Sequence, residues 1–222
     1  MLEITNLTKK YKNAMIFDSC NVSFRDKAVS FIMGPNGAGK TTLIKCILEL
    51  EGYDGSICFN SKPMSSYRSK CLTLWDDCPF YQNISGLENL VLFSEGKASA
   101  SEIEKLPIKY LDHTILRRKV KTYSYGQKKK LALYLVDILK PEILIMDEIS
   151  NGLDYEMMKS LKKHIKQLSE NRMIILTGHQ FGFYNGLVDD VFILKDKKLV
   201  LFDKDLSESD KSLEEIYDEE LY

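Results

Sequence analysis

Residues 34–41 read Gly-Pro-Asn-Gly-Ala-Gly-Lys-Thr, and this octapeptide says more about the fold than any other stretch of the chain. It matches the pattern G-x-x-x-x-G-K-S/T, whose glycines let the backbone curl until its N–H groups point inward at a phosphate. An apolar, β-prone run over residues 29–33 precedes it, and a helix-compatible run over residues 42–48 follows it. This order predicts a phosphate-binding loop between a strand and the N-terminus of a helix, rather than a plain glycine-rich turn.

Two side chains of this loop, Lys40 and Thr41, have predicted roles in binding a nucleotide. Lys40 can reach the β- and γ-phosphates of a nucleoside triphosphate, and the hydroxyl of Thr41 can be a ligand of Mg²⁺. The positive dipole end of the helix that begins near Lys40 adds to the attraction. We therefore expect a nucleoside triphosphate to be bound by Gly34, Pro35, Asn36, Gly37, Ala38, Gly39, Lys40, Thr41 and Thr42.

The composition of the 222-residue chain points away from several classes of protein. The 31 basic residues nearly balance the 32 acidic ones, so nothing points to a nucleic-acid partner. No apolar run reaches the length of about 18 residues that a membrane span needs. The 5 cysteines are never spaced as C-x-x-C and the 3 histidines add no metal-ligand pattern, so reduced thiols in a cytosolic protein are expected.

Hydrophobic patterns along the chain predict an α/β fold. Short apolar and polar bursts within residues 1–33 indicate strands separated by turns, and residues 53–60 and 71–75 indicate further strands. The second half of the chain alternates helices and wholly apolar strands, which favours a parallel sheet covered on both faces. These expected elements are a buried helix at 131–139, a strand at 143–146, a helix at 155–169 and a strand at 173–176.

Residues 85–122 differ in character, because their pattern is helical and charged. They predict a small helical subdomain inserted into the core. This part and the segment after it are basic, with Arg117, Arg118, Lys119, Lys121 and then Lys128–Lys130. The sequence leaves two interpretations of this basic run open: a solvated face, or contact with a partner's acidic loop or with ATP phosphates.

Two carboxylates follow the apolar strand at 143–146. The strand carries Asp147 to its carboxyl end, where open α/β sheets place their ligands, and we expect Asp147 in the shell of Mg²⁺. Glu148, one residue on, can orient or deprotonate an attacking water. Together with the phosphate-binding loop, this pair predicts hydrolysis of the bound nucleotide.

Residues 123–130 read Tyr-Ser-Tyr-Gly-Gln-Lys-Lys-Lys, just before the buried helix. A serine and a glycine at a helix N-terminus make a second anion site, with a hydroxyl and free N–H groups as donors. One chain rarely needs two phosphate-binding helix ends. Two chains arranged head to tail would need both, because each would complete the site of the other.

With these motifs in this order, the chain resembles the ATP-binding cassette (ABC) ATPase family over nearly its whole length. Tyr11 matches the aromatic residue that stacks on adenine, and residues 34–42 match the Walker A loop. Ser124, Gly126 and Gln127 match the family's signature sequence. The resemblance implies that ATP and Mg²⁺ are the ligands, and that the signature of one chain faces the ATP held by another.

The resemblance also assigns residues in the second half. Asp147 and Glu148 match the Walker B aspartate and the catalytic glutamate, and His179 matches the switch histidine that contacts the γ-phosphate. Residues 150–154 are similar to the D-loop, which adds Asp154 to the ATP site. The implied catalytic residues are therefore Glu148, His179 and Lys40.

Three positions depart from the family pattern. An ungapped match puts Asp76 where the family has its Q-loop glutamine, and this carboxylate can still be a ligand of Mg²⁺. The third residue of the signature is Tyr125 instead of glycine, and the D-loop has Ile149 instead of proline. None of the three removes the catalytic carboxylate or the loop lysine, so we expect ATP hydrolysis to survive.

The fold that the resemblance implies is the ABC nucleotide-binding domain. It has a P-loop α/β core with an N-terminal antiparallel β-subdomain and an inserted helical subdomain. We expect a single domain over residues 1–222, with the core at about 1–76 and 124–222 and the helical subdomain at about 77–123.

The function that the resemblance implies is that of an ATPase which drives transport. Two subunits, either two copies of this chain or this chain and a paralogous ATPase, would sit peripherally on the cytoplasmic face of the cell membrane and grip a separate membrane-spanning permease subunit. Residues 118–127 and the short helical insert resemble the export-type subfamily, which handles drugs, peptides or similar amphiphiles. The alternative is a soluble ABC-type ATPase outside transport, such as an iron–sulfur assembly ATPase.

Overall fold

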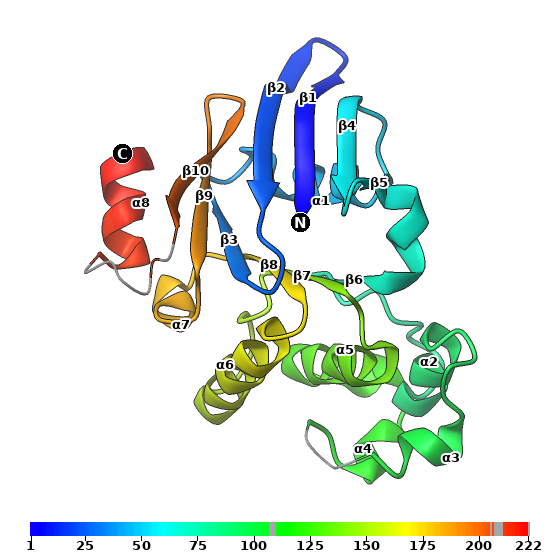
Figure 1. Cartoon of the computed structure of the whole chain (residues 1–222). Helices are drawn as coiled ribbons and strands as arrows, with labels where there is room; N and C mark the ends of the chain where they lie inside the picture. The colour runs from blue at the N-terminus through cyan, green and yellow to red at the C-terminus, as the bar shows by residue number, and fades with distance from the viewer. Residues whose placement is uncertain (107–109, 205, 207–210, 222) are drawn as a thin grey trace.

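The computed structural model describes residues 1–106, 110–204, 206 and 211–221, and these residues form two sheets with helices around them (Figure 1). The smaller sheet is antiparallel, with the strand order β2-β1-β4-β5. Its strands are β1 (Leu2–Tyr11), β2 (Ala14–Phe24), β4 (Asp54–Phe59) and β5 (Lys62–Pro63). The predicted antiparallel β-subdomain is therefore present, and its first two strands form one long hairpin rather than several short strands.

The larger sheet has the strand order β10-β9-β3-β8-β7-β6. The pairs from β9 through β3, β8 and β7 to β6 are all parallel, and only β10 joins in antiparallel fashion. The strands are β3 (Val29–Met33), β6 (Cys71–Leu74), β7 (Ile143–Asp147), β8 (Met173–Thr177), β9 (Asp190–Lys195) and β10 (Lys198–Lys204). This confirms the parallel sheet that the apolar strands predict.

Every residue of β3, β7 and β8 is buried, because successive side chains of each strand enter two different cores. Ile32 and Ile145 pack with the small sheet and with α1 (Lys40–Ile47). Phe31 and Leu144 belong to the other core, which contains α5 (Tyr125–Leu139), α6 (Tyr155–Ser169), α7 (Phe181–Tyr184) and α8 (Leu213–Leu221). Burial on both faces explains why these strands read as apolar without interruption.

The expected helical insert lies apart from the small sheet, below β6 in Figure 1. Its elements are α2 (Gly86–Phe93), α3 (Ala100–Ile103), α4 (His113–Leu116) and the 3₁₀ turn η2 (Val120–Thr122), and a further 3₁₀ turn, η1 (Met64–Lys70), precedes β6. Serines cap α2 and α3, since Ser85 and Ser99 each form a capping box with a glutamate three residues on. Residues 107–109 lie outside the described part of the chain, and the limits of 77–123 for a separate subdomain stay a prediction.

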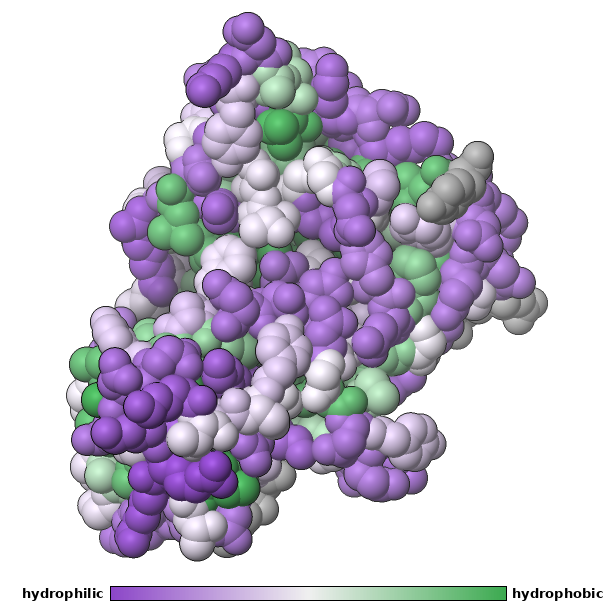
Figure 2. Space-filling view, turned by 180° about the vertical axis from the view of Figure 1, so that it is seen from behind, coloured by the Kyte–Doolittle hydropathy of each residue, from purple (hydrophilic) through white to green (hydrophobic). Residues whose placement is uncertain are grey.

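The face opposite the view of Figure 1 is mostly hydrophilic, and its hydrophobic residues lie in small separate patches (Figure 2). Among the residues that the structure describes, no helix combines the length and the apolar character that crossing a bilayer requires.

Candidate functional site

The phosphate-binding loop connects β3 to α1 as the sequence predicts. Gly39 is the N-cap of α1 with a φ of 112°, and a Cβ at this position would lie 2.8 Å from Cγ2 of Ile16. Only glycine fits this left-handed and crowded position without strain. Because Gly39 has no side chain to cap α1, the first N–H groups of the helix are left for an external anion.

Most of the predicted ATP and metal residues line one hollow of about 430 Å³, which we call the phosphate hollow. It lies where β3, β7 and β8 end, so residues far apart in the sequence meet there. The residues that line it are Pro35, Asn36, Gly37, Gly39, Lys40, Thr41, Thr42, Asp76, Asp147, Glu148 and His179.

Lys40 is folded over its own loop. Its Nζ donates to the carbonyl oxygens of Gly34 at 2.7 Å and Pro35 at 3.3 Å, and it lies 3.3 Å from Nε2 of His179. Burial lowers the pKa of Lys40, although the carboxylates of Glu148 and Asp147 act in the opposite direction. The ammonium group is thus poorly hydrated at the floor of the hollow, where an anion would stabilise its charge.

Asp147 ends β7 and is 8% exposed. The hydroxyl of Thr177, its partner in register on β8, donates to Oδ1 of Asp147. This hydrogen bond orients the carboxylate toward the hollow. Thr177 is a residue that the sequence reasoning missed, and the available signal was a threonine that ends an otherwise apolar strand.

Glu148 begins the turn after β7 with a φ of 52°, a left-handed conformation that is uncommon for a residue with a side chain. Oε1 of Glu148 lies 3.4 Å from Nε2 of His179. Burial raises the pKa of Glu148, and the neighbouring charge of Asp147 adds to this, while His179 and Lys40 act against it. A carboxylate with a raised pKa beside a histidine is a suitable group for proton transfer.

The signature residues do not line the phosphate hollow of their own chain. Ser124 is the N-cap of α5, where its Oγ accepts from the N–H of Gln127 at 3.2 Å, and the side chain of Gln127 accepts from the N–H of Ser124 at 3.0 Å. A Cβ on Gly126 would lie 2.4 Å from the carbonyl oxygen of Gly152. The signature therefore packs tightly on the D-loop of the same chain.

Asp154 and Tyr11 also lie outside the lining of the phosphate hollow. Asp154 caps α6, because its carboxylate accepts from the N–H of Met157 at 2.8 Å and from Lys130 at 3.0 Å. Tyr11 ends β1 with 40% of its surface exposed, and Nζ of Lys9 lies 4.5 Å from the centre of its ring. Their contacts with ATP stay predictions.

The middle residue of the basic run at 128–130 fits neither a solvated face nor contact with a partner or with ATP phosphates. Lys129 is neither on a solvated face nor at the phosphate hollow, because its side chain is 0% exposed. Its Nζ donates to Oδ1 of Asp76 at 3.1 Å. A wholly polar stretch of sequence gave no sign of this burial, which depends on the position of the lysine on α5.

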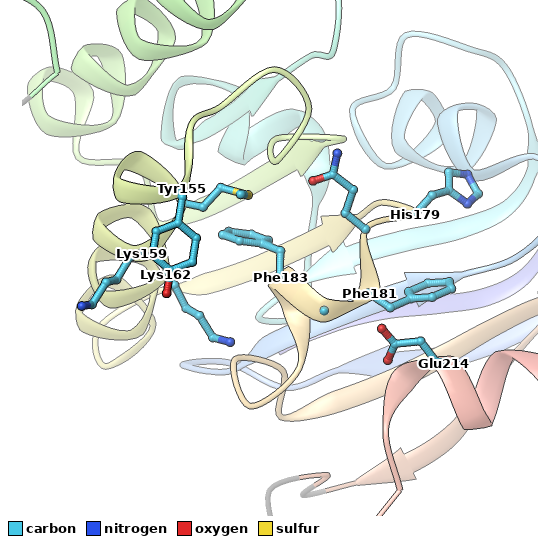
Figure 3. A pocket seen from close by; sticks show the side chains of 10 residues that line it. Tyr155, Lys159, Lys162, His179, Phe181, Phe183 and Glu214 are labelled. Atoms are coloured by element: carbon cyan, nitrogen blue, oxygen red, sulfur yellow. The ribbon is translucent and has the colours of Figure 1, made fainter.

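A larger hollow of about 680 Å³ lies beside His179. Figure 3 shows its walls, formed by Tyr155, Lys159 and Lys162 of α6, Phe181 and Phe183 of α7, and Glu214 of α8. Among the described residues, none of the phosphate-binding loop lines it. The smaller hollow is therefore the candidate nucleotide site, because it contains the helix N-terminus, the lysine and the two carboxylates.

Comparison with known proteins gives the same picture. The profile of the ABC transporter family matches residues 17–151. The lantibiotic transport ATP-binding protein SrtF of Streptococcus pyogenes is 31% identical over 100% of this chain and 97% of its own length. The bacitracin transport ATP-binding protein BcrA of Enterococcus faecalis is 28% identical over 90% of this chain and 68% of its own length.

Two solved structures show the same fold. An ATP-binding subunit of an ABC transporter superimposes with a TM-score of 0.86 at 23% identity, covering 99% of this chain and 98% of the other. A dimeric ATP-binding cassette solved with ADP and Pi gives a TM-score of 0.79 at 20% identity, covering 90% of this chain and 96% of the other. Together with the two motif-bearing strand ends and the full-length relatives, the match shows that the chain belongs to the ABC transporter family, as an ATP-binding cassette ATPase.

Proposed function

We propose that this chain is the ATP-hydrolysing motor subunit of an exporter of peptide antibiotics or similar amphiphiles, and that it works as a head-to-tail dimer on a separate membrane subunit. The observation that carries the proposal is the phosphate hollow, in which Lys40, Glu148 and His179 meet around the N-terminus of α1. The helix N-terminus and the Lys40 cation can bind phosphate, and Glu148 beside His179 can act as a base.

The phosphate hollow fits the triphosphate of ATP. The uncapped N–H groups of α1 and the ammonium of Lys40 face the same space, and both favour an anion. Phosphate oxygens would replace the carbonyl oxygens of Gly34 and Pro35 as partners of Lys40. Tyr11 would stack on the adenine, as the resemblance to the family implies.

The same hollow fits a magnesium ion. Thr41 and Asp147 both line it, and the hydrogen bond from Thr177 keeps the Asp147 carboxylate oriented. Thr41 and Asp147 would hold the ion, and Mg²⁺ would supply positive charge that neutralises the phosphates. Hydroxyl and carboxylate oxygens are the ligands that this hard cation prefers.

Glu148 and His179 serve the reaction itself. The carboxylate of Glu148 holds or accepts a proton of the attacking water, and its raised pKa favours that transfer. Nε2 of His179 lies 3.4 Å from this carboxylate and 3.3 Å from Nζ of Lys40, so it lies between the base and the phosphate-binding cation. This position suits a contact with the terminal phosphate.

A second subunit would complete the site. Ser124, Gly126 and Gln127 offer a capped helix start, and they line no part of the phosphate hollow in their own chain. In the head-to-tail arrangement they would close over the ATP of the partner, with Asp154 of the D-loop beside them. The dimeric cassette with ADP and Pi supports pairing of this fold.

The transported substrate class comes from the relatives. The lantibiotic and bacitracin transport proteins named above both act with peptide antibiotics, and SrtF matches along the whole chain. We propose that this chain binds a membrane permease at the cytoplasmic face of the membrane and drives export of such peptides.

Ser124→Arg tests the dimer, combined with Glu148→Gln to slow hydrolysis. The variant keeps its own phosphate-binding loop, so it should bind nucleotide as a monomer and fail to dimerise with ATP in size-exclusion chromatography. Ser99→Arg is the matched control, because it also removes a capping serine from a helix but lies on α3. Ser124→Arg without the second change should also lose ATPase activity. If the double variant still dimerises and the single variant still turns over ATP, the proposed head-to-tail site is wrong. Loss of nucleotide binding would instead mean that the signature acts within its own chain.

Export is tested in cells that express the chain with the membrane proteins encoded beside its gene. Survival in lantibiotic or bacitracin should rise with the wild-type chain and stay low with Glu148→Gln. Equal survival of the two strains with every peptide tried would contradict the proposed substrate class.

A further inference from the structure

Lys129 is a fully buried cation that lies next to the proposed catalytic turn, and it has no part in the proposed function. It lies on the first turns of α5, and its side chain is 0% exposed. A buried ammonium group is costly unless charged and hydrogen-bonding partners surround it. The partners of Lys129 therefore show which groups its buried charge stabilises.

Lys129 has two oxygen partners on different segments. Its Nζ donates to Oδ1 of Asp76 at 3.1 Å and to the backbone carbonyl of Glu148 at 3.0 Å. The ring of Tyr125, one turn earlier on α5, lies 5.4 Å from Nζ, within the range of a cation–π contact. The lysine thus connects the segment after β6 with the turn that bears the proposed base.

Asp76 also forms hydrogen bonds with Tyr125 and Asn151. Its Oδ1 also accepts from the hydroxyl of Tyr125 and from Nδ2 of Asn151 at 3.4 Å, and its backbone carbonyl accepts from Tyr125 at 3.0 Å. We call Asp76, Tyr125, Lys129 and Asn151 the Lys129 cluster. One carboxylate oxygen receives three donors, so Asp76 is directed toward α5 and the D-loop, although 45% of its side chain is exposed.

The backbone at Glu148 needs such support. Its φ of 52° is left-handed, a conformation that persists in a residue with a side chain only where the surroundings fix it. Three hydrogen bonds fix this residue. Its N–H donates to the carbonyl of Thr177 at 3.2 Å, and its carbonyl accepts from the N–H of Asn151 at 3.2 Å and from Nζ of Lys129. The angle at which the Glu148 carboxylate enters the phosphate hollow follows from this backbone.

We propose that Lys129 is a positioning residue for Glu148, and that Asp76 is its counter-ion, so that the aspartate at the Q-loop position and the buried lysine function only as a pair. The proposal rests on the proposed function for the role of Glu148. It explains an aspartate where the family has glutamine: an amide carries no charge to balance the buried ammonium. Asp76 is then an anchor in the structure rather than the magnesium ligand that the sequence suggests.

If Asp76 and Lys129 function as a pair, restoring the family's glutamine at position 76 should impair the protein. Asp76→Gln alone should lower kcat by about tenfold or more, because it leaves Lys129 buried without a counter-ion. Lys129→Gln alone should do the same, since Asp76 loses its charged donor and the Glu148 carbonyl keeps only the N–H of Asn151. The double variant Asp76→Gln/Lys129→Gln should recover most of this loss, because two amides can donate and accept within the cluster without a net charge.

Further readouts separate positioning from general damage. Trp75, the single tryptophan of the chain, lines a hollow with Thr41 and Asp147, so we expect its fluorescence to change when a nucleotide binds. Affinity for ATP should change less than threefold in all variants while kcat changes, because Asp76, which lines the phosphate hollow, directs its carboxylate to Tyr125 and Lys129 and not to the phosphate-binding loop. Lys128→Gln, which removes the preceding charge on α5, is the matched control and should leave kcat within about twofold.

Melting temperatures of the wild-type chain, the two single variants and the double variant test the ion pair without reference to turnover. The double variant should be more stable than the sum of the single losses predicts. Additive melting temperatures, an unchanged or higher kcat in Asp76→Gln alone, or a double variant no better than the worse single one would each overturn the proposal. Absence of turnover in the wild-type chain would instead contradict the proposed function, and the melting temperatures would still decide whether the pair exists.

Discussion

The two sides of the proposed catalytic glutamate are built in different ways. On one side the phosphate-binding loop is a continuous stretch, residues 34–42, whose backbone turns and helix start make the anion site. On the other side the Lys129 cluster collects single side chains from the segment after β6, from α5 and from the D-loop. Both sides fix Glu148, the first through His179 and Lys40 and the second through its backbone carbonyl.

The difference shows where this chain can depart from its family. A site made of backbone N–H groups tolerates no change in its glycines, and here the loop follows the family pattern throughout. A site made of side chains can be rebuilt if charges and donors change together. Two of the three departures, Asp76 and Tyr125, are hydrogen-bonded to each other, and the third, Ile149, is fully buried in the core that contains α5 to α8.

The largest effect should come from Glu148, which both sides hold. Glu148→Gln keeps the shape and hydrogen-bonding capacity of the side chain and removes its basicity, so steady-state ATPase activity should fall by ~10²-fold or more. ATP binding should persist, and the closed dimer should accumulate in size-exclusion chromatography. Undiminished turnover in a phosphate-release assay would remove Glu148 from the reaction.

The loop side alone is tested by Lys40→Ala. The change removes a charge-assisted contact with the phosphates, a class worth roughly 1.5–3 kcal/mol, so ATP affinity should fall by about one to two decades. Binding is measured by the fluorescence of Trp75 or of an ATP analogue. Lys45→Ala, on the same helix but outside the phosphate hollow, is the control. Equal affinity of Lys40→Ala and wild type would contradict the proposed role of the loop.

A smaller effect is expected from Thr177→Val, which removes the hydroxyl that orients Asp147 but keeps the shape of the side chain. Loss of a partner of this kind typically weakens metal binding by about 10-fold or more. The Mg²⁺ concentration needed for half-maximal ATPase activity should therefore rise, while kcat at saturating Mg²⁺ changes little. An unchanged Mg²⁺ requirement would show that Asp147 does not depend on Thr177.

The smallest effect concerns the pH dependence of the Lys129 cluster. Burial by itself raises the pKa of Asp76, but hydrogen bonds from Tyr125 and Lys129 and the charge of Lys129 together hold it below its ordinary value of 3.8. The folded protein therefore binds this proton less tightly than the unfolded chain does. The stabilisation is complete above pH 3.8 and is lost as the pH falls through the lower folded-state pKa.

Asp76→Asn should accordingly lower the melting temperature at pH 7 by a few degrees, roughly 2–4 °C for a contribution of about 1 kcal/mol. The difference from wild type should shrink as the pH approaches 3. Thermal denaturation followed by the fluorescence of Trp75 measures both. A difference that grows toward acid pH would mean that the Asp76 carboxylate is not held in its charged form.

The sequence alone predicted the features that depend on neighbouring residues, namely the phosphate-binding loop and the buried parallel strands. The octapeptide at 34–41 predicts a strand, a loop and a helix because glycine conformations and the Lys-Thr pair are local properties. The wholly apolar runs that became β7 and β8 predict buried parallel strands, since such runs need cover on both faces. The positions of Asp147 and Glu148 could also be predicted, because the last residue of a strand and the one after it lie at the edge of the sheet where ligands bind.

Only the tertiary structure decided what Lys129 does. The sequence shows three lysines in a row, and helical geometry turns the middle one inward, where β7 and the segment after β6 meet α5. Its counter-ion lies 53 residues earlier in the chain, and no local pattern links a lysine to an aspartate at that distance. The partner of a buried charge is set by which segments the fold brings together, because electrostatic and hydrogen-bonding contacts depend on distance in space and not on separation in sequence.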